Sequence, residues 1–172
     1  MPKKSSMAGH CLILGAKSDI ARAIAHEFAG AGFSLYLAGR KADRDITPDA
    51  KDIAIRHGVT ASAHEFDAVD YDTHADFYAA LEPKPEVVVC VVGYMPEQEE
   101  SETDLAKARA VMATNYIGCA NILSLAANDM AARKSGTIIG ISSVAGERGR
   151  ASNYFYGSAK AGFTAFLDGL RN

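Results

Sequence analysis

Tyr156 and Lys160 are the residues of this sequence whose types and spacing best suit acid–base chemistry. They stand four residues apart, so they share one face if the segment is helical. A lysine cation close to a phenol stabilises the phenolate form, which suits a group that gives or takes a proton. The neighbouring Tyr154 has Ser158 at the same spacing, and a serine supplies no charge. The spacing alone arises readily by chance, so the rest of the chain must support it.

A glycine turn, LILGAKSDIA, lies near the start of the chain, at residues 12–21. A strand, Gly15 and a helix start follow one another there, an order that suits pyrophosphate binding by backbone N–H groups and the helix dipole. Asp19 stands where a second glycine is usual, and Ala21 takes the place of the third. Asp19 can favour the helix start while it is turned away from a ligand. By itself this turn is a weak indication of a dinucleotide site.

The end of the next apolar run indicates which cofactor would be used. A carboxylate at this place would bind the ribose hydroxyls of NAD, but the run LYLAGR ends in Gly39 and Arg40. Arginine can pair bidentately with a 2′-phosphate, and Lys17 in the glycine turn adds positive charge. The alternative is that Arg40 is a solvated loop cation. We therefore predict NADP as the cofactor, with NAD less favoured.

Composition excludes several other classes of protein. The chain has 172 residues, 48% of them hydrophobic and 23% charged, which predicts one globular domain. A net charge of -3 gives no footprint for nucleic acid. The longest apolar run, 87–92, is too short for a membrane span. Cys11, Cys90 and Cys119 are widely spaced, which predicts buried, reduced thiols and a cytoplasmic protein, and the histidines form no metal-ligand pair.

Apolar runs alternate with helix-period segments along the chain, which predicts a doubly wound parallel α/β sheet of the Rossmann type. Ser18 is expected to cap the first helix, with Ile20, Ala23, Ile24 and Phe28 on its buried face. We expect a polar lead at 1–9 and a single dinucleotide-binding and catalytic domain at 10–172 that is incomplete at its C-terminus. The predicted strands are 10–15, 33–39, 60–66, 86–92 and 136–142, and the predicted helices are 18–32, 50–56, 72–82, 102–133 and one from 153.

The segment SSVAGERGRASNYFYGSAKAG, residues 142–162, resembles the catalytic segment of the short-chain dehydrogenases/reductases. In that family a serine lies thirteen residues before the tyrosine of a YxxxK motif, which selects Ser143 and not Ser142. The resemblance implies that Tyr156 is the proton donor or base, that Lys160 binds ribose and tunes Tyr156, and that Ser143 binds the reacting oxygen. Asn115 in MATNYIGCANIL would position a water in the proton relay. The reaction implied is hydride transfer between NADP(H) and a carbonyl or alcohol carbon.

The resemblance also implies a cofactor site and an assembly. The family's NNAG after the fourth strand is replaced here by Cys90, Val91, Val92 and Gly93, so asparagine hydrogen bonds to the cofactor are lost. Homo-oligomerisation, as a dimer or tetramer, would pair the long helix with the last one through Ile117, Ile122, Leu123, Leu125, Phe163 and Phe166. The implied cofactor-binding residues are Gly15, Lys17, Ser18, Asp19, Ile20, Arg40, Asp67, Ala68, Gly93, Tyr156 and Lys160.

The same segment, together with the acidic residue in the glycine turn, is similar to reductases of 2-keto pentoses carried on polyprenyl phosphate. Such a reductase follows an oxidation by a flavin partner. One alternative is a non-catalytic dinucleotide-binding module that senses the cofactor or assembles with a partner. Another is a parallel α/β domain of unrelated function, because a fold alone does not fix function.

Overall fold

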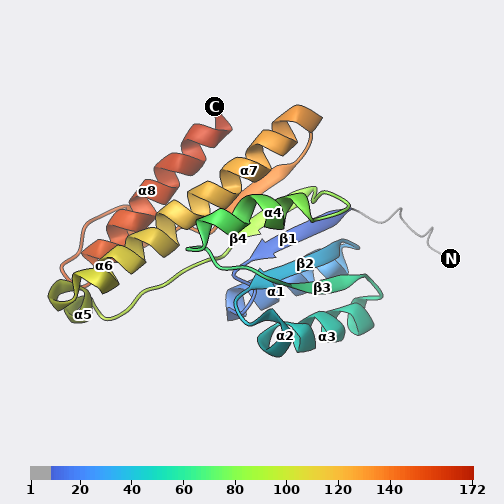
Figure 1. The fold of residues 1–172 in the computed structure, drawn as a ribbon, viewed down its shortest axis with the longest axis horizontal. Coiled ribbons are helices and arrows are strands. Elements are labelled where there is room, and N and C mark those ends of the chain that lie inside the picture. Colours follow the sequence, from blue (N-terminus) through green and yellow to red (C-terminus); the bar gives the residue numbers. More distant parts are fainter. Residues whose placement is uncertain (1–8) are drawn as a thin grey trace.

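A five-stranded parallel sheet organises the computed structural model, which describes residues 9–172 (Figure 1). The predicted polar lead therefore lies almost wholly outside the described residues. The strand order is β3-β2-β1-β4-β5, as the alternating pattern predicts for a doubly wound sheet. The strands are β1 His10–Leu14, β2 Ser34–Gly39, β3 Ala61–Glu65, β4 Val87–Cys90 and β5 Thr137–Gly140.

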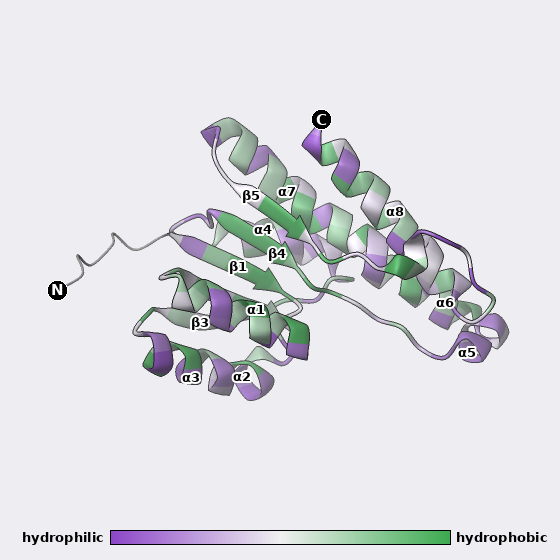
Figure 2. Cartoon of the chain, turned by 180° about the vertical axis from the view of Figure 1, so that it is seen from behind, coloured by the Kyte–Doolittle hydropathy of each residue, from purple (hydrophilic) through white to green (hydrophobic). Residues whose placement is uncertain are grey.

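Both faces of the central strands are buried, which explains why they are apolar without alternation. In the register, Leu12 lies between Tyr36 and Val88, and the next residue, Ile13, lies between Leu37 and Val89. Leu12 and Ile13 therefore belong to two separate cores, one on each face of the sheet. Figure 2 shows the hydrophobic strands between helices that are polar on their outer sides.

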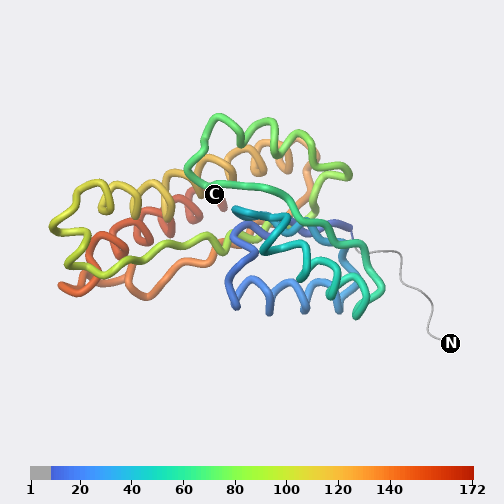
Figure 3. The backbone as a smooth tube through the Cα atoms, turned by 60° about the horizontal axis from the view of Figure 1, so that its bottom comes forward, coloured from blue at the N-terminus to red at the C-terminus, as the bar shows by residue number. Residues whose placement is uncertain are grey.

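Helices cover the sheet on both faces. Ala21, Ala25 and Ala29 of α1 and Ile53 of α3 pack on one face, and Ile122 of α7 belongs to the core on the other. Figure 3 shows α6 and α8 running together beyond the carboxyl ends of the strands. The α-helices are α1 Asp19–Gly30, α2 Ala42–Asp45, α3 Thr47–His57, α4 His74–Ala79, α5 Gln98–Thr103, α6 Leu105–Met112, α7 Gly118–Arg133 and α8 Tyr154–Arg171.

The prediction for the buried face of α1 is wrong. The buried stripe is made of the three alanines just named, while Ile20 is 57% exposed and Ala23 is also exposed. Small side chains let α1 lie close to the sheet, so Ile24 and Phe28 reach the core only from its border. The predicted cap is confirmed, because the Ser18 hydroxyl accepts a hydrogen bond from the Ala21 N–H at 3.1 Å.

Two other boundaries differ from the prediction. Residues 41–49, which lie outside every predicted helix and strand, contain the short helix α2 and the start of α3. The predicted helix 102–133 is divided at Asp104, whose carboxylate caps α6 by accepting a hydrogen bond from the Ala106 N–H at 2.8 Å. From Leu105 to Arg133 the chain is helical throughout and is long and apolar enough, by those criteria alone, to cross a membrane. In this fold its second half packs on the sheet through Cys119, Ile122 and Leu123, as the core helix of a globular domain does.

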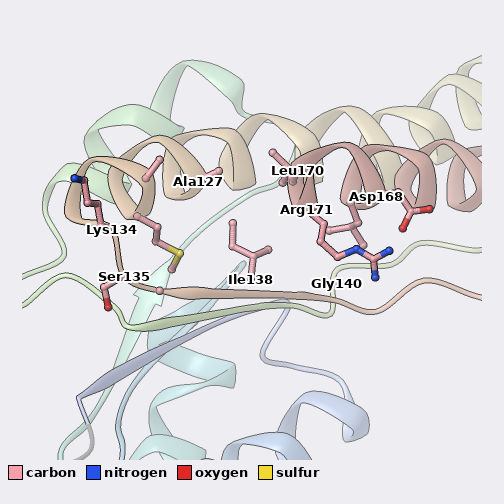
Figure 4. Close-up of a pocket in the computed structure, with 12 residues that line it drawn as sticks. Ala127, Lys134, Ser135, Ile138, Gly140, Asp168, Leu170 and Arg171 are labelled. Carbon is pink, nitrogen blue, oxygen red and sulfur yellow. The ribbon is translucent and has the colours of Figure 1, made fainter.

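A groove of about 680 Å³ runs along β5 between α7 and α8 (Figure 4). Met130, Ile138 and Leu167 contribute apolar side chains to its lining. Asp168 and Arg171 lie at its α8 side. Within residues 9–172, β5 pairs only with β4, so its other edge is unpaired there. None of the predicted catalytic residues lines it, so this groove is separate from the candidate site.

Candidate active site

The carboxyl ends of the five strands meet at one edge of the sheet, and each is followed by a predicted site residue. Gly15 follows β1, Arg40 follows β2, Asp67 follows β3, Gly93 follows β4 and Ser143 follows β5. β1 and β4 are neighbours in the sheet although two strands separate them in the sequence. The connections leave this pair in opposite directions, which opens a crevice of the kind that binds ligands in doubly wound sheets.

Gly15 is required by the backbone of its turn. Its φ is +84°, and a Cβ there would lie 2.9 Å from the Val92 nitrogen on the neighbouring strand's extension. Any larger residue would be strained and would collide with that backbone. The turn therefore lies tightly against the chain after β4 and directs the start of α1 into the crevice.

The acidic residue of the glycine turn is exposed and paired with a cation. The Asp19 side chain is 99% exposed and pairs with Arg22 at 3.1 Å, and Arg22 also binds Asp49 at 2.8 Å. Its charge is therefore directed to solvent and countered by a cation.

The two basic residues predicted to favour NADP differ in their partners. Lys17 forms an ion pair with Asp45 at 2.5 Å, and hydrogen bonds from Arg44 and Lys17 hold the pKa of that carboxyl well below its usual range. Arg40 is exposed and forms no ion pair within residues 9–172. Arg40 is thus an exposed, unpaired cation directly after β2, and Lys41 beside it is another within the described residues.

The loop after β3 is held by its own side chains. The Asp67 carboxylate accepts a hydrogen bond from the Val69 N–H at 3.1 Å, and the Asp67 carbonyl lies 2.9 Å from Nε2 of His74. Ala68 is buried beneath α7, where a Cβ on Gly118 would lie only 1.9 Å from the Ala68 carbonyl oxygen. The glycine therefore permits this close approach.

Ser143 and Tyr156 line one cavity of about 290 Å³ beside the carboxyl ends of β4 and β5. The Ser143 hydroxyl accepts a hydrogen bond from the Ala145 N–H at 3.1 Å, which fixes the serine at the start of a short 3₁₀ turn. Ser142 faces elsewhere, because its hydroxyl lies 2.6 Å from that of Thr164 on α8. The structure therefore brings Ser143, and not Ser142, together with Tyr156.

Lys160 is buried beside this cavity, with 3% of its surface exposed. Its Nζ donates to the Val92 carbonyl at 3.3 Å and to the Ile141 carbonyl at 3.0 Å, and it lies 5.8 Å from the centre of the Tyr156 ring. An ammonium has three donors, so one remains for a further partner. Burial lowers the pKa of Lys160.

Asn115 lies in a π-helical segment, Ala113–Ile117, between α6 and α7. Its amide oxygen accepts from the Tyr94 N–H at 3.0 Å, and its amide nitrogen donates to the carbonyls of Tyr94 at 2.6 Å and Val111 at 2.8 Å. The side chain is fully buried and joins the helix to the loop after β4. Asn115 thus has a structural role, whether or not it also takes part in the proton relay that the resemblance implies.

We expect Asn115→Ala to lower the free energy of unfolding by about 1–3 kcal/mol, because it removes the hydrogen bonds that this buried side chain makes to the backbone of Tyr94 and Val111. Asn128→Ala is the matched control, since Asn128 is exposed on α7. That variant should stay within about 0.5 kcal/mol of the parent protein. Urea denaturation followed by circular dichroism measures both, and equal stabilities of the two variants would contradict the structural role of Asn115.

Sequence reasoning missed the other residues of the cavity, namely Met95, Val144, Ala145, Arg150 and Asn153. They come from the loop after β4 and from the segment between β5 and α8. Arg150 and Asn153 lie inside the segment that carries the serine and tyrosine, so proximity in sequence was the available signal. Met95 gave none, because only the fold brings it to the cavity.

Fold and site together define a Rossmann-type α/β domain with a serine, a tyrosine and a lysine gathered at the carboxyl edge of its sheet, beside β4 and β5. Residues 9–172 match the sequence model of the short chain dehydrogenase family. The chain belongs to that family, and the resemblance read from residues 142–162 is confirmed.

Several relatives carry names that describe oxidoreductases. An uncharacterised oxidoreductase of Mycobacterium tuberculosis is 34% identical over 166 residues, which are 95% of this chain and 66% of the relative. Sulfoacetaldehyde reductase 2 of Chromohalobacter salexigens is 30% identical over 168 residues, which are 96% of this chain and 66% of that protein. The chain thus spans just under two thirds of the length of these curated relatives.

Solved structures agree on the fold. A short-chain dehydrogenase from Rhodopseudomonas palustris superposes with a TM-score of 0.85 at 25% identity, over 94% of this chain and 76% of that one. The actinorhodin polyketide ketoreductase gives a TM-score of 0.86 at 21% identity, over 96% of this chain and 65% of that one, which supports the fold alone. The predicted doubly wound sheet is confirmed.

Proposed function

We propose that this protein is an NADP(H)-dependent oxidoreductase that interconverts a carbonyl compound and an alcohol. The observation that carries the proposal is the cavity shared by Ser143 and Tyr156, with the buried Lys160 Nζ 5.8 Å from the centre of the Tyr156 ring. Consumption of NADPH in the presence of ketones and aldehydes is the test. Cofactor binding without turnover of any carbonyl compound would instead support a non-catalytic binding module.

The described residues fit a nicotinamide dinucleotide. The first turn of α1 offers backbone N–H groups to a pyrophosphate, while Gly15, whose own N–H donates to the Ala38 carbonyl at 2.9 Å, lets the chain turn toward that helix, and the Asp19 charge is countered by Arg22. Lys160 has one donor left for a ribose hydroxyl. Gly93 is exposed, and a Cβ on it would meet only the Asn115 amide oxygen, at 3.7 Å, so the backbone there is accessible to a ligand.

When bound, the nicotinamide would supply or accept the hydride. Tyr156 would donate a proton from its hydroxyl to the carbonyl oxygen during reduction and take it back during oxidation. Ser143 would hydrogen-bond the same oxygen, and the Lys160 cation would stabilise the phenolate that Tyr156 leaves. Asn115 would hold a water near the loop after β4, through which the proton could be replaced.

Cofactor preference depends on Arg40 in this proposal. NADPH should bind more tightly than NADH by about 1.5–3 kcal/mol, the contribution of a charge-assisted hydrogen bond, and Arg40→Asp should reverse the preference. Arg56→Asp, the control, changes the net charge equally at the far end of α3, where Arg56 pairs with Asp52. Fluorescence titration measures both affinities. Equal affinity of the parent protein for NADPH and NADH would refute the assignment.

For the substrate we propose a keto-sugar on a polyprenyl phosphate, as in the reductase component of decaprenylphosphoryl-ribose 2-epimerase. Arg150 lines the cavity and could pair with an anionic group of the substrate. The name of the sulfoacetaldehyde reductase describes a carbonyl compound that carries a sulfonate, so an anionic substrate has a precedent among the relatives. The test is to compare turnover of anionic carbonyl compounds with that of neutral ones, and the proposal expects faster turnover of the anionic compounds.

We further propose a cytoplasmic homo-oligomer that pairs through α6–α7 and α8. Of the six apolar residues that suggested it, Ile122, Leu123 and Phe163 are buried in this chain's own core, and Leu125 and Phe166 pack against that core. Ile117 remains, and it is 48% exposed. We expect light scattering to give at least a dimeric mass and Ile117→Glu to give a monomer. A monodisperse monomer of the parent protein would contradict the pairing.

A further inference from the structure

Asn153 has an unused hydrogen-bonding atom beside the catalytic side chains. It is the residue immediately before α8, where an asparagine side chain commonly caps the helix. Here the side chain makes no capping bond. Its amide oxygen is buried, and within residues 9–172 no group donates a hydrogen bond to it. A buried acceptor without a donor is costly, so a role beyond helix capping is required to explain it.

The surroundings of Asn153 point to a ligand. It lines the same cavity as Ser143 and Tyr156 and lies three residues before Tyr156, just outside the helix. A group held by Asn153 would therefore lie close to the atom that Tyr156 protonates. A positively charged donor is disfavoured, because Arg150 lines this cavity too. A neutral hydroxyl is the donor that fits.

We propose that Asn153 is a specificity-determining residue, whose amide oxygen accepts a hydrogen bond from a hydroxyl on the carbon next to the reacting carbonyl. This rests on the proposed oxidoreductase function and defines its substrates as α-hydroxy carbonyl compounds, a class that includes keto-sugars. A site built to pair with a hydroxyl discriminates against an analogue that lacks it, because its own polar atom is then left unpaired.

Hydroxyacetone and butanone test the proposal because they have nearly the same shape. The carbon next to the carbonyl carries a hydroxyl in hydroxyacetone and a methyl in butanone. Ligand-observed NMR titration with saturating NADP⁺ measures binding without turnover. The parent protein should bind hydroxyacetone about three- to tenfold more tightly, the contribution of one neutral hydrogen bond. Asn153→Ala should bring the ratio close to one. Asn153→Asp, which keeps an acceptor, should retain a preference for hydroxyacetone.

Val144→Ala is the matched control, because Val144 lines the cavity with apolar atoms alone. It should weaken both ligands by similar factors and leave their ratio unchanged. Equal affinities of the parent protein for the two ligands, or no measurable affinity for either, would overturn the proposal, as would a ratio that survives in Asn153→Ala. An Asn153-dependent preference in a protein that turns over no ketone or aldehyde would refute the oxidoreductase function and leave this binding role standing.

Discussion

Tyr156→Phe is expected to lower turnover by about 10²–10⁴-fold, the usual contribution of a positioned acid–base group. The substitution removes only the hydroxyl, which makes no hydrogen bond to another described residue, and the ring can still line the cavity. Folding and NADPH binding should therefore be preserved. Rates are compared with one accepted ketone under saturating NADPH.

Tyr154→Phe is the control for this result. Tyr154 lies outside the cavity, is 41% exposed and packs against Phe155 with ring centres 4.7 Å apart. The turnover of the Tyr154→Phe variant should stay within a few-fold of that of the parent protein. An inactive Tyr154→Phe combined with an active Tyr156→Phe would show that the assignment of the tyrosine, and with it that of Ser143, is in the wrong register.

Lys160→Ala is expected to reduce both turnover and affinity for the cofactor. The ammonium would lose its contact with ribose, worth about 1.5–3 kcal/mol for a charged donor, or roughly a tenfold to hundredfold weaker Kd for NADPH. The same change removes the donor from the carbonyls of Val92 and Ile141 and opens a space in the core, so the protein should also unfold at lower denaturant concentration.

Lys160→Met separates these effects, because it keeps most of the apolar stem and lacks the charge. It should recover part of the stability but neither the turnover nor the cofactor affinity. Fluorescence titration and urea denaturation measure the two properties independently. A variant with normal NADPH affinity and reduced stability would mean that Lys160 only joins β4, β5 and α8, without a role in binding.

Much of the sheet could be predicted because each strand can be recognised from a few consecutive residues. Strands such as β4 are buried on both faces, so their residues are uniformly apolar, and the alternation with helices allows few arrangements other than a parallel sheet. The short helix α2 was missed because its four residues are mostly charged and it is held from outside, by the Glu65 carboxylate, which accepts from the N–H groups of Lys41 and Ala42 at 2.9 and 2.8 Å.

The candidate site was only partly predictable, for a related reason. Ser143, Tyr156 and Lys160 lie within one short segment, so their spacing could be read from the sequence. Met95 reaches the cavity only through the fold, and the unpaired oxygen of Asn153 depends on a backbone conformation just before α8 that composition does not specify. Partners that lie far apart in the sequence leave no periodic pattern.

The π-helical turn at Ala113–Ile117 makes the position of Asn115 depend on chain length. Such a turn holds one residue more than the α-helical turn it replaces, so α6 and α7 have different rotational phases although they form one rod. Deleting a single residue here would restore a regular α-helix and rotate one half against the other by about 100°. Asn115 and Gly118 could then not both keep their contacts, with Tyr94 and Ala68 respectively. The position of the Asn115 side chain thus depends on the extra residue of the π-helical turn as much as on the presence of an asparagine.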